Sequence, residues 1–303
     1  MSSVVEFSRL FDLEKIETNQ FVGHSCNAMW GRIFGGQVVA QALVAAQRTV
    51  ACDRFAHSLH AYFLRAGDPH LPIIYEVEII RDGGSFSARQ VRAKQEGALI
   101  FLLCCSFQKP EGGFELHREK LKNIPQPEEL KEEFYAENAS SSKFSELVKS
   151  YLQFHKPFAV RPVDVDNYLH RHKRVTTQQL WFKPSEPVIG QEDQKLRAAI
   201  LSYLSDMSLL DTALYVHGFS IFSKNLQFAS IDHSMWFHRD FSLDDWLLYE
   251  LESPNSSGAR GLSRGFIYNR EGVLLASVAQ EGLMRLIGCL LYTSPSPRDQ
   301  RGS

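Results

Sequence analysis

The alternation of apolar and polar residues predicts one buried helix and four strands in the first part of the chain. Phe34–Gln47 opens with two glycines and continues as an almost wholly apolar run of Ala, Val and Leu. This favours a helix that is surrounded by sheet and whose first turn is closely approached by other backbone. Residues 1–22 are typical of a short helix followed by a strand. Segments bounded by Gly-Asp-Pro, Asp-Gly-Gly and Glu-Gly turns predict strands at His57–Arg65, Leu71–Arg81, Ser85–Gln95 and Ala98–Gln108.

The second part of the chain repeats this pattern. At one common offset Phe63 aligns with Phe237, and the Tyr-Glu-x-Glu sequence at Tyr75–Glu78 recurs at Tyr249–Glu252. These matches indicate a tandem duplication, which has to be recognised before a fold is proposed. The predicted elements here are a helix at Lys195–Leu214 and strands at Phe158–Tyr168, Thr176–Lys183, Phe228–Arg239, Trp246–Ser253, Arg260–Tyr268 and Val273–Met284.

A helix followed by an antiparallel meander, present twice, predicts the α+β class. We expect an N-terminal repeat over residues 1–112, a connector over 113–157 and a C-terminal repeat over 158–286. The connector is rich in Lys and Glu and is typical of a surface segment with one or two short helices. Residues 287–303 contain two prolines, lack periodicity and have no counterpart in the first repeat, so we interpret them as a non-native tail.

Composition narrows the classes of function. The 303 residues are 44% hydrophobic and 22% charged, which is typical of a globular protein without a membrane span. A formal net charge of −2 gives no electrostatic reason to expect a nucleic-acid partner. The five cysteines are irregularly spaced and include no Cys-x-x-Cys pair, so we expect a reducing compartment and no cysteine-based metal site.

Gly261-Leu-Ser-Arg-Gly265 matches the Gly-x-Ser-x-Gly pattern of a hydrolase nucleophile elbow. That elbow requires a helix directly after the serine, because the serine must lie on a strained turn between strand and helix. The residues from Arg264 to Tyr268 instead continue a predicted strand. We therefore do not expect Ser263 to be a nucleophile.

Three polar residues break the repeat. Gln280 stands where the first copy has Cys105, Asp206 lies in the helical region where the first copy has Gly35-Gly36, and Ser230 leads an aromatic strand. In an apolar site, an acid, a hydroxyl and an amide can hold one water, with the carboxylate taking its proton. Each residue alone equally fits a hydrogen-bonded polar group at the end of an element, and the pattern leaves that alternative open.

Four longer motifs carry a resemblance to a known family. They are Phe34-Gly-Gly-Gln-Val, the segment from His57 to Pro69, the segment from Ile231 to Arg239, and Ala279-Gln-Glu-Gly282. Through them the chain resembles the type II acyl-CoA thioesterases of double-hotdog fold over roughly Phe7 to Arg285. The resemblance implies two antiparallel sheets, each wrapped around a central helix, and a substrate that is fatty acyl-CoA. It also implies self-association and no metal or cofactor.

The family's Asp, Ser/Thr and Gln triad falls on Asp206, Ser230 and Gln280. The resemblance implies that these residues activate water for direct attack on the thioester, with backbone N–H groups at the start of a central helix meeting the oxyanion. Because coenzyme A carries phosphates, cationic side chains are expected at the mouth of the site. The candidates are Arg65, Arg89, Arg260 and Arg264.

Two alternatives use the same fold and substrate class. An enoyl-CoA hydratase would need an Asp/His pair, but Asp232 and His233 are neighbours in a predicted strand and should point apart. A non-catalytic acyl-CoA-binding protein would keep the tunnel and lose the triad. As to location, similar family members lie in peroxisomes, whereas Arg301-Gly302-Ser303 is not a Ser-Lys-Leu-type signal. We expect a peroxisomal protein if the native chain ends in such a signal, and a cytosolic one otherwise.

Overall fold

The computed structural model describes residues 7–25, 31–130, 157–171 and 173–287, and the expected tail lies almost entirely outside them. The described strands form one continuous 13-stranded sheet in the order β1-β2-β4-β5-β6-β3-β10-β13-β12-β11-β8-β7, with β9 paired to β13 beside this path. All pairings are antiparallel. This is the α+β arrangement that the repeated pattern predicts.

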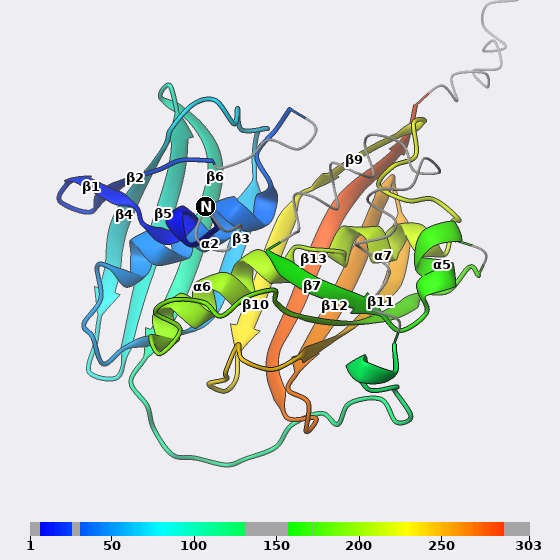
Figure 1. Cartoon of the computed structure of the whole chain (residues 1–303). Helices are drawn as coiled ribbons and strands as arrows, with labels where there is room; N and C mark the ends of the chain where they lie inside the picture. The colour runs from blue at the N-terminus through cyan, green and yellow to red at the C-terminus, as the bar shows by residue number, and fades with distance from the viewer. Residues whose placement is uncertain (1–6, 26–30, 131–156, 172, 288–303) are drawn as a thin grey trace, which may run out of the picture.

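The first repeat contributes one long helix, one 3₁₀ turn and six strands. They are η1 (Arg9–Phe11), β1 (Glu14–Glu17), β2 (Gln20–Gly23), α2 (Gly35–Gln47), β3 (Phe55–Phe63), β4 (Ile73–Asp82), β5 (Phe86–Gln95) and β6 (Ala98–Gln108). Helix α2 lies against one face of these strands (Figure 1). Every residue of α2 after Gly35 is buried, as its nearly uniform apolar surface predicts.

The second repeat has the same strand meander but an interrupted helix. Its elements are β7 (Phe158–Pro162), α5 (Val165–His170), β8 (Thr177–Pro184), α6 (Gln194–Ser205), α7 (Leu209–Tyr215), β9 (Leu226–Ser230), β10 (Asp232–Phe237), β11 (Leu247–Ser257), β12 (Arg260–Tyr268) and β13 (Leu274–Leu286). Helices α6 and α7 lie on the same side of the sheet as α2, and α6 packs against α2 (Figure 1).

The two expected sheets are joined edge to edge. Strand β3 of the first repeat pairs with β10 of the second, from Ser58 opposite Trp236 to Tyr62 opposite Asp232. The main-chain ladder therefore crosses from one repeat to the other without an exposed edge between them. One apolar core extends beneath both halves and includes Leu43 and Leu59 from the first repeat and Leu201 and Met235 from the second.

Three sequence-based boundaries were wrong. The helix expected over Lys195–Leu214 is broken between Ser205 and Leu209, and the strand expected over Phe228–Arg239 is divided at Ile231 into β9 and β10. The strand expected over Phe158–Tyr168 stops at Pro162. There the carboxylate of Asp164 accepts the N–H of Asn167 at 3.0 Å, which caps the start of α5.

The described part of the connector packs against the second repeat. Arg118 Nη1 lies 2.8 Å from Glu250 Oε2, and Lys120 Nζ donates to the carbonyl of Arg270 at 2.7 Å. Of the one or two short helices expected in the connector, the described residues contain a 3₁₀ turn, η2 (Pro127–Glu129), and residues 131–156 lie outside the described residues. Among the described helices, none is long and apolar enough to cross a membrane.

Candidate active site

Asp206 lies at the break between α6 and α7. It is the residue that follows the last turn of α6, and Ser208, two residues later, has a φ of 63°, in the left-handed region. The hydroxyl of Tyr249 on β11 donates to the carbonyl of Ser205 at 2.8 Å and so satisfies one of the acceptors that a helix end leaves open. The break turns the chain so that the Asp206 side chain reaches a cavity.

The start of α2 approaches Asp206 from the first repeat. A Cβ added to Gly35 would lie 2.7 Å from Asp206 Oδ2, and one added to Gly36 would overlap the carbonyl oxygen of Tyr203 on α6. The backbone N–H of Gly36 lies close enough to the Asp206 carboxylate to lower its pKa. The two glycines therefore permit the close backbone approach that the sequence predicts, and they place the positive end of a helix against a carboxylate.

Ser230 and Gln280 complete the group. Ser230 is the last residue of β9, and Gln280 lies within β13, where its Nε2 donates to Ser230 Oγ at 2.7 Å. Hydrogen bonding from both side chains lowers the pKa of Asp206, so both lie beside its carboxylate. The three residues that break the sequence repeat are therefore brought together, from the end of α6, the end of β9 and the middle of β13.

Burial raises the pKa of Asp206 above its ordinary value. Loss of solvation is the largest cause, and it is partly offset by the charge of His233 and by hydrogen bonds from Gln280, Gly36 and Ser230. Asp206 Oδ1 is buried and has no hydrogen-bond partner within the described ranges. An unpartnered buried carboxylate oxygen is costly, which makes it a functional-site candidate.

Asp206 lines a cavity of about 300 Å³. The cavity is lined by residues of both repeats, and its apolar wall comprises Ile33, Val38, Phe63, Ile100, Phe101, Leu210, Ile221 and Phe228. A second carboxylate, Asp211, also lines it, but that group is paired with the buried Arg171 and accepts the N–H of Ile221. Asp206 is therefore the better-placed base of the two.

The four arginines proposed for the mouth of the site have different environments. Arg65 lines the cavity and donates to the carbonyl of Leu99. Arg260 and Arg264 do not line it, and each pairs with a carboxylate on its own sheet, Glu281 at 2.9 Å and Glu252 at 2.6 Å.

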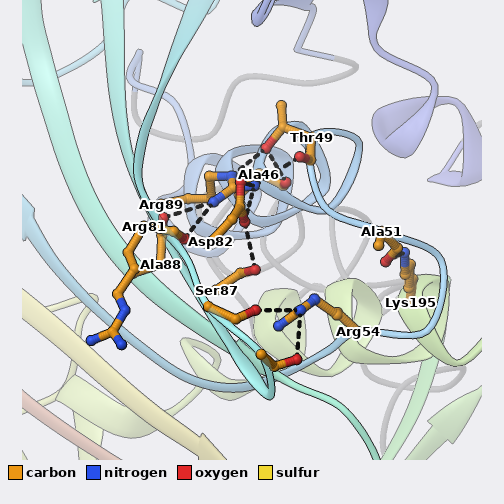
Figure 2. Close-up of polar contacts among 12 residues, drawn as sticks. Ala46, Thr49, Ala51, Arg54, Arg81, Asp82, Ser87, Ala88, Arg89 and Lys195 are labelled. Atoms are coloured by element: carbon orange, nitrogen blue, oxygen red, sulfur yellow. Dashed lines mark hydrogen bonds and ion pairs between the residues drawn. The ribbon is translucent and has the colours of Figure 1, made fainter.

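Arg89 is not at the mouth at all. It is 2% exposed, pairs with Asp82 at 2.8 Å, and donates to Oγ1 and the carbonyl of Thr49 at the end of α2. Figure 2 shows this cluster, in which Arg89 and Asp82 meet beside Thr49 and Ser87. The expectation that Arg89 meets substrate phosphates is wrong, because its guanidinium is buried and occupied by the protein itself.

Sequence reasoning overlooked two residues near Asp206. Arg32 lines the cavity, donates to the carbonyl of Phe228 at 3.2 Å and lies with its guanidinium over the Phe228 ring; burial lowers its pKa, and the charge of Asp206 partly offsets this. His233 is fully buried and contacts Gln280. The signal for His233 was present in the repeat, where the first copy has Leu59. No comparable signal marked Arg32.

The Gly-x-Ser-x-Gly sequence at Gly261–Gly265 lies within a strand, as expected. Ser263 lies in the middle of β12, which continues as strand to Tyr268, and its side chain is fully buried. It stands opposite Gln280 in the β12–β13 register, and its Oγ has no hydrogen-bond partner among the described residues. Because no helix follows the serine, the motif is not a nucleophile elbow.

Asp232 and His233 occupy separate environments, as their adjacency in a strand predicts. The carboxylate of Asp232 accepts the N–H of Glu281 at 2.8 Å, whereas the His233 ring contacts Ser205 and Gln280. In the described ranges, no three His, Cys, Asp or Glu side chains form a group that could hold a metal ion. The candidate chemistry is therefore that of a carboxylate, a hydroxyl and an amide around one point at a cavity wall.

Comparison with known proteins assigns the chain to a class. Residues 25–108 match the family described as acyl-CoA thioesterase N-terminal domain, and residues 148–283 match the family described as acyl-CoA thioesterase. A solved protein from Alicyclobacillus acidocaldarius described as having a hot dog fold shares the architecture, with a TM-score of 0.73, 16% identity and coverage of 92% of this chain and 97% of that one. The chain belongs to the acyl-CoA thioesterase family and has the tandem hotdog fold.

Individual relatives match over most of their length. Acyl-CoA thioesterase 2 of Haemophilus influenzae is 40% identical over 91% of this chain and 96% of its own. Human acyl-coenzyme A thioesterase 8 is 38% identical over 91% of this chain and 88% of its own. The solved acyl-CoA thioesterase II of Mycobacterium marinum superposes with a TM-score of 0.77 at 36% identity, over 94% of this chain and 99% of that one.

Proposed function

We propose that this protein hydrolyses fatty acyl-CoA to a free fatty acid and coenzyme A, using water activated by Asp206, Ser230 and Gln280. Membership of the family makes thioester hydrolysis the reaction, and the proposal adds the acyl group and the residues. The observation that carries it is Asp206, which lines a largely apolar cavity and whose buried Oδ1 has no hydrogen-bond partner among the residues that the structure describes. The Ser230 hydroxyl and the Gln280 amide, hydrogen-bonded to each other at 2.7 Å, stand beside this carboxylate.

The reaction needs only groups that this site contains. Asp206 takes a proton from water as the water oxygen attacks the thioester carbonyl carbon, and Ser230 and Gln280 fix the orientation of that water. The tetrahedral oxyanion then collapses, the C–S bond breaks, and coenzyme A leaves as its thiolate, which takes up a proton. No bond forms between the protein and the acyl group.

The start of α2 is suited to the oxyanion. Of its first-turn N–H groups, that of Gln37 donates to the carbonyl of Phe34 at 3.2 Å and that of Gly36 faces Asp206. Gly35, the first residue of the helix, lines the cavity next to Asp206 and is the remaining first-turn donor. Backbone donors that are already aimed at a developing negative charge need no rearrangement during the reaction. The acyl chain would lie along the apolar wall, and Arg32 and Arg65 are the cavity-lining cations available to the phosphates of coenzyme A.

The decisive experiment is the Asp206→Asn variant, assayed by release of free thiol from acyl-CoA. We expect kcat to fall by roughly 10²–10⁴, the usual worth of a general base. Asp12→Asn is the matched control, because the Asp12 side chain is 90% exposed and lies 3.7 Å from its nearest cation. A folded Asp206→Asn protein with a near wild-type rate would remove Asp206 from the proposal.

The same assay separates the alternatives. A hydratase would consume an enoyl-CoA without releasing thiol, and a binding protein would retain acyl-CoA without turnover. Ser263→Ala tests the remaining serine mechanism, and we expect its activity to be largely unchanged. A folded but inactive Ser263→Ala protein would restore the elbow reading.

We further propose a peroxisomal location. A Saccharomyces cerevisiae relative described as peroxisomal acyl-coenzyme A thioester hydrolase 1 is 26% identical over 82% of this chain, which supports it. The Haemophilus influenzae relative comes from a bacterium, which has no peroxisomes, and it therefore favours the cytosolic alternative. An N-terminal fluorescent fusion of the protein should coincide with a peroxisomal marker, and diffuse cytosolic fluorescence would contradict this.

We also propose that the protein self-associates. The outer face of the sheet around the β3–β10 junction carries partly exposed aromatic side chains, with Tyr62 56% and Trp236 37% exposed. Exposed apolar groups gathered on one face are typical of an interaction surface. Light scattering should give a mass that is a multiple of the chain mass, and a monomer at assay concentration would contradict the proposal.

A further inference from the structure

His233 links the end of α6 to the catalytic amide. It lies in β10 with its side chain fully buried. One ring nitrogen, Nε2, is 2.9 Å from Ser205 Oγ, and the other, Nδ1, is 2.7 Å from Gln280 Oε1. Since Gln280 Nε2 in turn donates to Ser230 Oγ, a continuous chain of hydrogen bonds runs from Ser205 through His233 and Gln280 to the cavity.

The direction of the hydrogen bonds in this chain follows from the chemistry of the amide. The NH₂ group of Gln280 must face Ser230 and Asp206, because a carbonyl oxygen turned toward the Asp206 carboxylate would place two acceptors together. The carbonyl oxygen of Gln280 then faces His233 and needs a donor there. Nδ1 must therefore carry a proton, whether the ring is neutral or cationic.

The other end of the chain is fixed as well. Ser205 Oγ lies 2.8 Å from the carbonyl of Ser202, one turn back in α6, and the Ser205 carbonyl accepts the hydroxyl of Tyr249. Ser205 directly precedes Asp206. The His233 ring is thus held against the same helix end that positions the base.

The repeat shows that the fold does not require a polar pair at this place. In the first repeat the corresponding residues are Leu59 and Cys105, which stand opposite each other on β3 and β6 and are both buried. In the second repeat His233 and Gln280 occupy the same positions on β10 and β13. A buried polar pair in place of an apolar one costs desolvation unless it serves a purpose.

We infer that His233 is a positioning residue: its Nδ1–H holds the oxygen of the Gln280 amide, so that the NH₂ group of that amide is presented to Ser230 and Asp206. His233 does not contact the reacting atoms and acts through Gln280. This inference rests on the proposed role of Gln280 in orienting water.

The test is a double-mutant cycle on kcat. His233→Leu places the residue of the first repeat at this position, and we expect kcat to fall roughly 10- to 100-fold with KM nearly unchanged, because the alignment of water is lost and acyl-CoA binding is not. Gln280→Leu should have a similar effect. In the double variant the losses should not add, since the histidine acts only through the amide.

Two further variants separate positioning from packing. Asn at 233 keeps a donor at the place of Nδ1, whereas Gln extends toward the place of Nε2 and Ser205. We expect His233→Asn to recover much of the lost kcat and His233→Gln to recover little. His238→Asn is the matched control, because His238 follows β10, is partly exposed and bonds Ser277 Oγ away from the cavity.

The outcomes are distinguishable. Wild-type kcat in folded His233→Leu, additive losses in the cycle, or greater activity in the Gln than in the Asn variant would each overturn the inference. If His233→Leu fails to fold, the Asn and Gln pair decides alone. Failure of the proposed function appears separately, as an Asp206→Asn protein that retains its rate.

Discussion

Asp206 is buried, and yet it must be ionised to act as a base. Burial raises its pKa above the value of about 3.9 that is usual for aspartate, and the titratable or charged groups that face it are His233 from β10, Tyr249 from β11 and Arg32 before α2. We expect kcat/KM to decline as pH falls through this raised pKa. The pH–rate profile should lose that acid limb in Asp206→Asn, and an acid limb at the ordinary aspartate value would contradict the assignment.

The raised pKa of Asp206 also predicts how the stability of the folded protein depends on pH. A carboxyl whose pKa is higher in the folded than in the unfolded state contributes stability below its unfolded pKa, and that contribution is lost as pH rises through the folded pKa. At pH 7 the ionised Asp206 is therefore destabilising. Asp206→Asn should unfold at a higher temperature than wild type at pH 7, with the difference shrinking toward pH 4. An unchanged or lower melting temperature at pH 7 would contradict it.

Arg89 should matter for stability and not for catalysis. Its guanidinium connects β5 to the segment after α2 through Thr49 and to the end of β4 through Asp82 (Figure 2). We expect Arg89→Met to lower the free energy of unfolding by about 2–4 kcal/mol, because buried acceptors lose their donor. Denaturant unfolding measures this, and kcat per folded protein should be unchanged. Arg92→Met, which removes a half-exposed cation from the same strand, is the control.

At the scale of residues, the sequence was informative wherever the two repeats could be compared. Asp206, Ser230 and Gln280 stood out because the first copy has other residues at their places, and the structure brings them together. The same comparison sets His233 against Leu59, which marks His233 as a further polar residue that breaks the repeat. Arg89 was placed wrongly because charge alone made it a candidate, whereas alternation along β5 puts its side chain on the buried face with Val91 and Ala93.

At the scale of elements, the paired glycines that open α2 are the most restrictive feature. Gly35→Ala would bring a methyl group 2.7 Å from Asp206 Oδ2. We expect the carboxylate to be displaced and kcat to fall roughly 100-fold, since a shift of about 1 Å has that effect on a reacting group. Steady-state assays measure the fall in kcat, and thermal unfolding checks that the variant is folded. Gly84→Ala is the control, because a Cβ there meets nothing within 4 Å, and equal activity of the two variants would contradict the prediction.

The helix break could not be predicted from the pattern. Residues 195–214 contain no Gly or Pro, and their apolar spacing fits one continuous helix. The structure interrupts it where Ser208 adopts a positive φ, an uncommon conformation for a residue with a Cβ. A tertiary contact supports that conformation, because the Ser208 carbonyl accepts the side-chain amide of Gln178 on β8 at 3.1 Å, beside the first helical bond of α7 from the N–H of Thr212.

At the scale of the whole molecule, the continuous sheet and the packing of α2 on α6 hold the repeats together. A protease site inserted between Gly112 and Gly113 tests the proposed division of the chain, because this segment is exposed and a Cβ at either glycine meets nothing within 4 Å. After cleavage, we expect the two pieces to elute together from a sizing column with activity retained. Separation of the pieces under native conditions would show that the connector, and not the sheet, keeps them together.

The fold class followed from the repeat, since each copy alone predicts a helix and a meander. What the sequence did not provide was the manner of joining, because the pairing of β3 with β10 uses main-chain groups that any residue supplies. The side chains on those strands alternate between apolar and polar, but this pattern does not indicate which strand each one pairs with.

The contact between Gly36 and Asp206 has a consequence for how variants of this protein are interpreted. All three reacting side chains belong to the second repeat, while the backbone that makes room for them and donates to the carboxylate belongs to the first. A homologue can therefore retain every member of the triad and still be inert, if a bulkier residue replaces either glycine. A survey that infers activity from the triad alone would classify such inactive proteins as enzymes. Checking the residues at the positions of Gly35 and Gly36, about 170 positions before Asp206, would identify them.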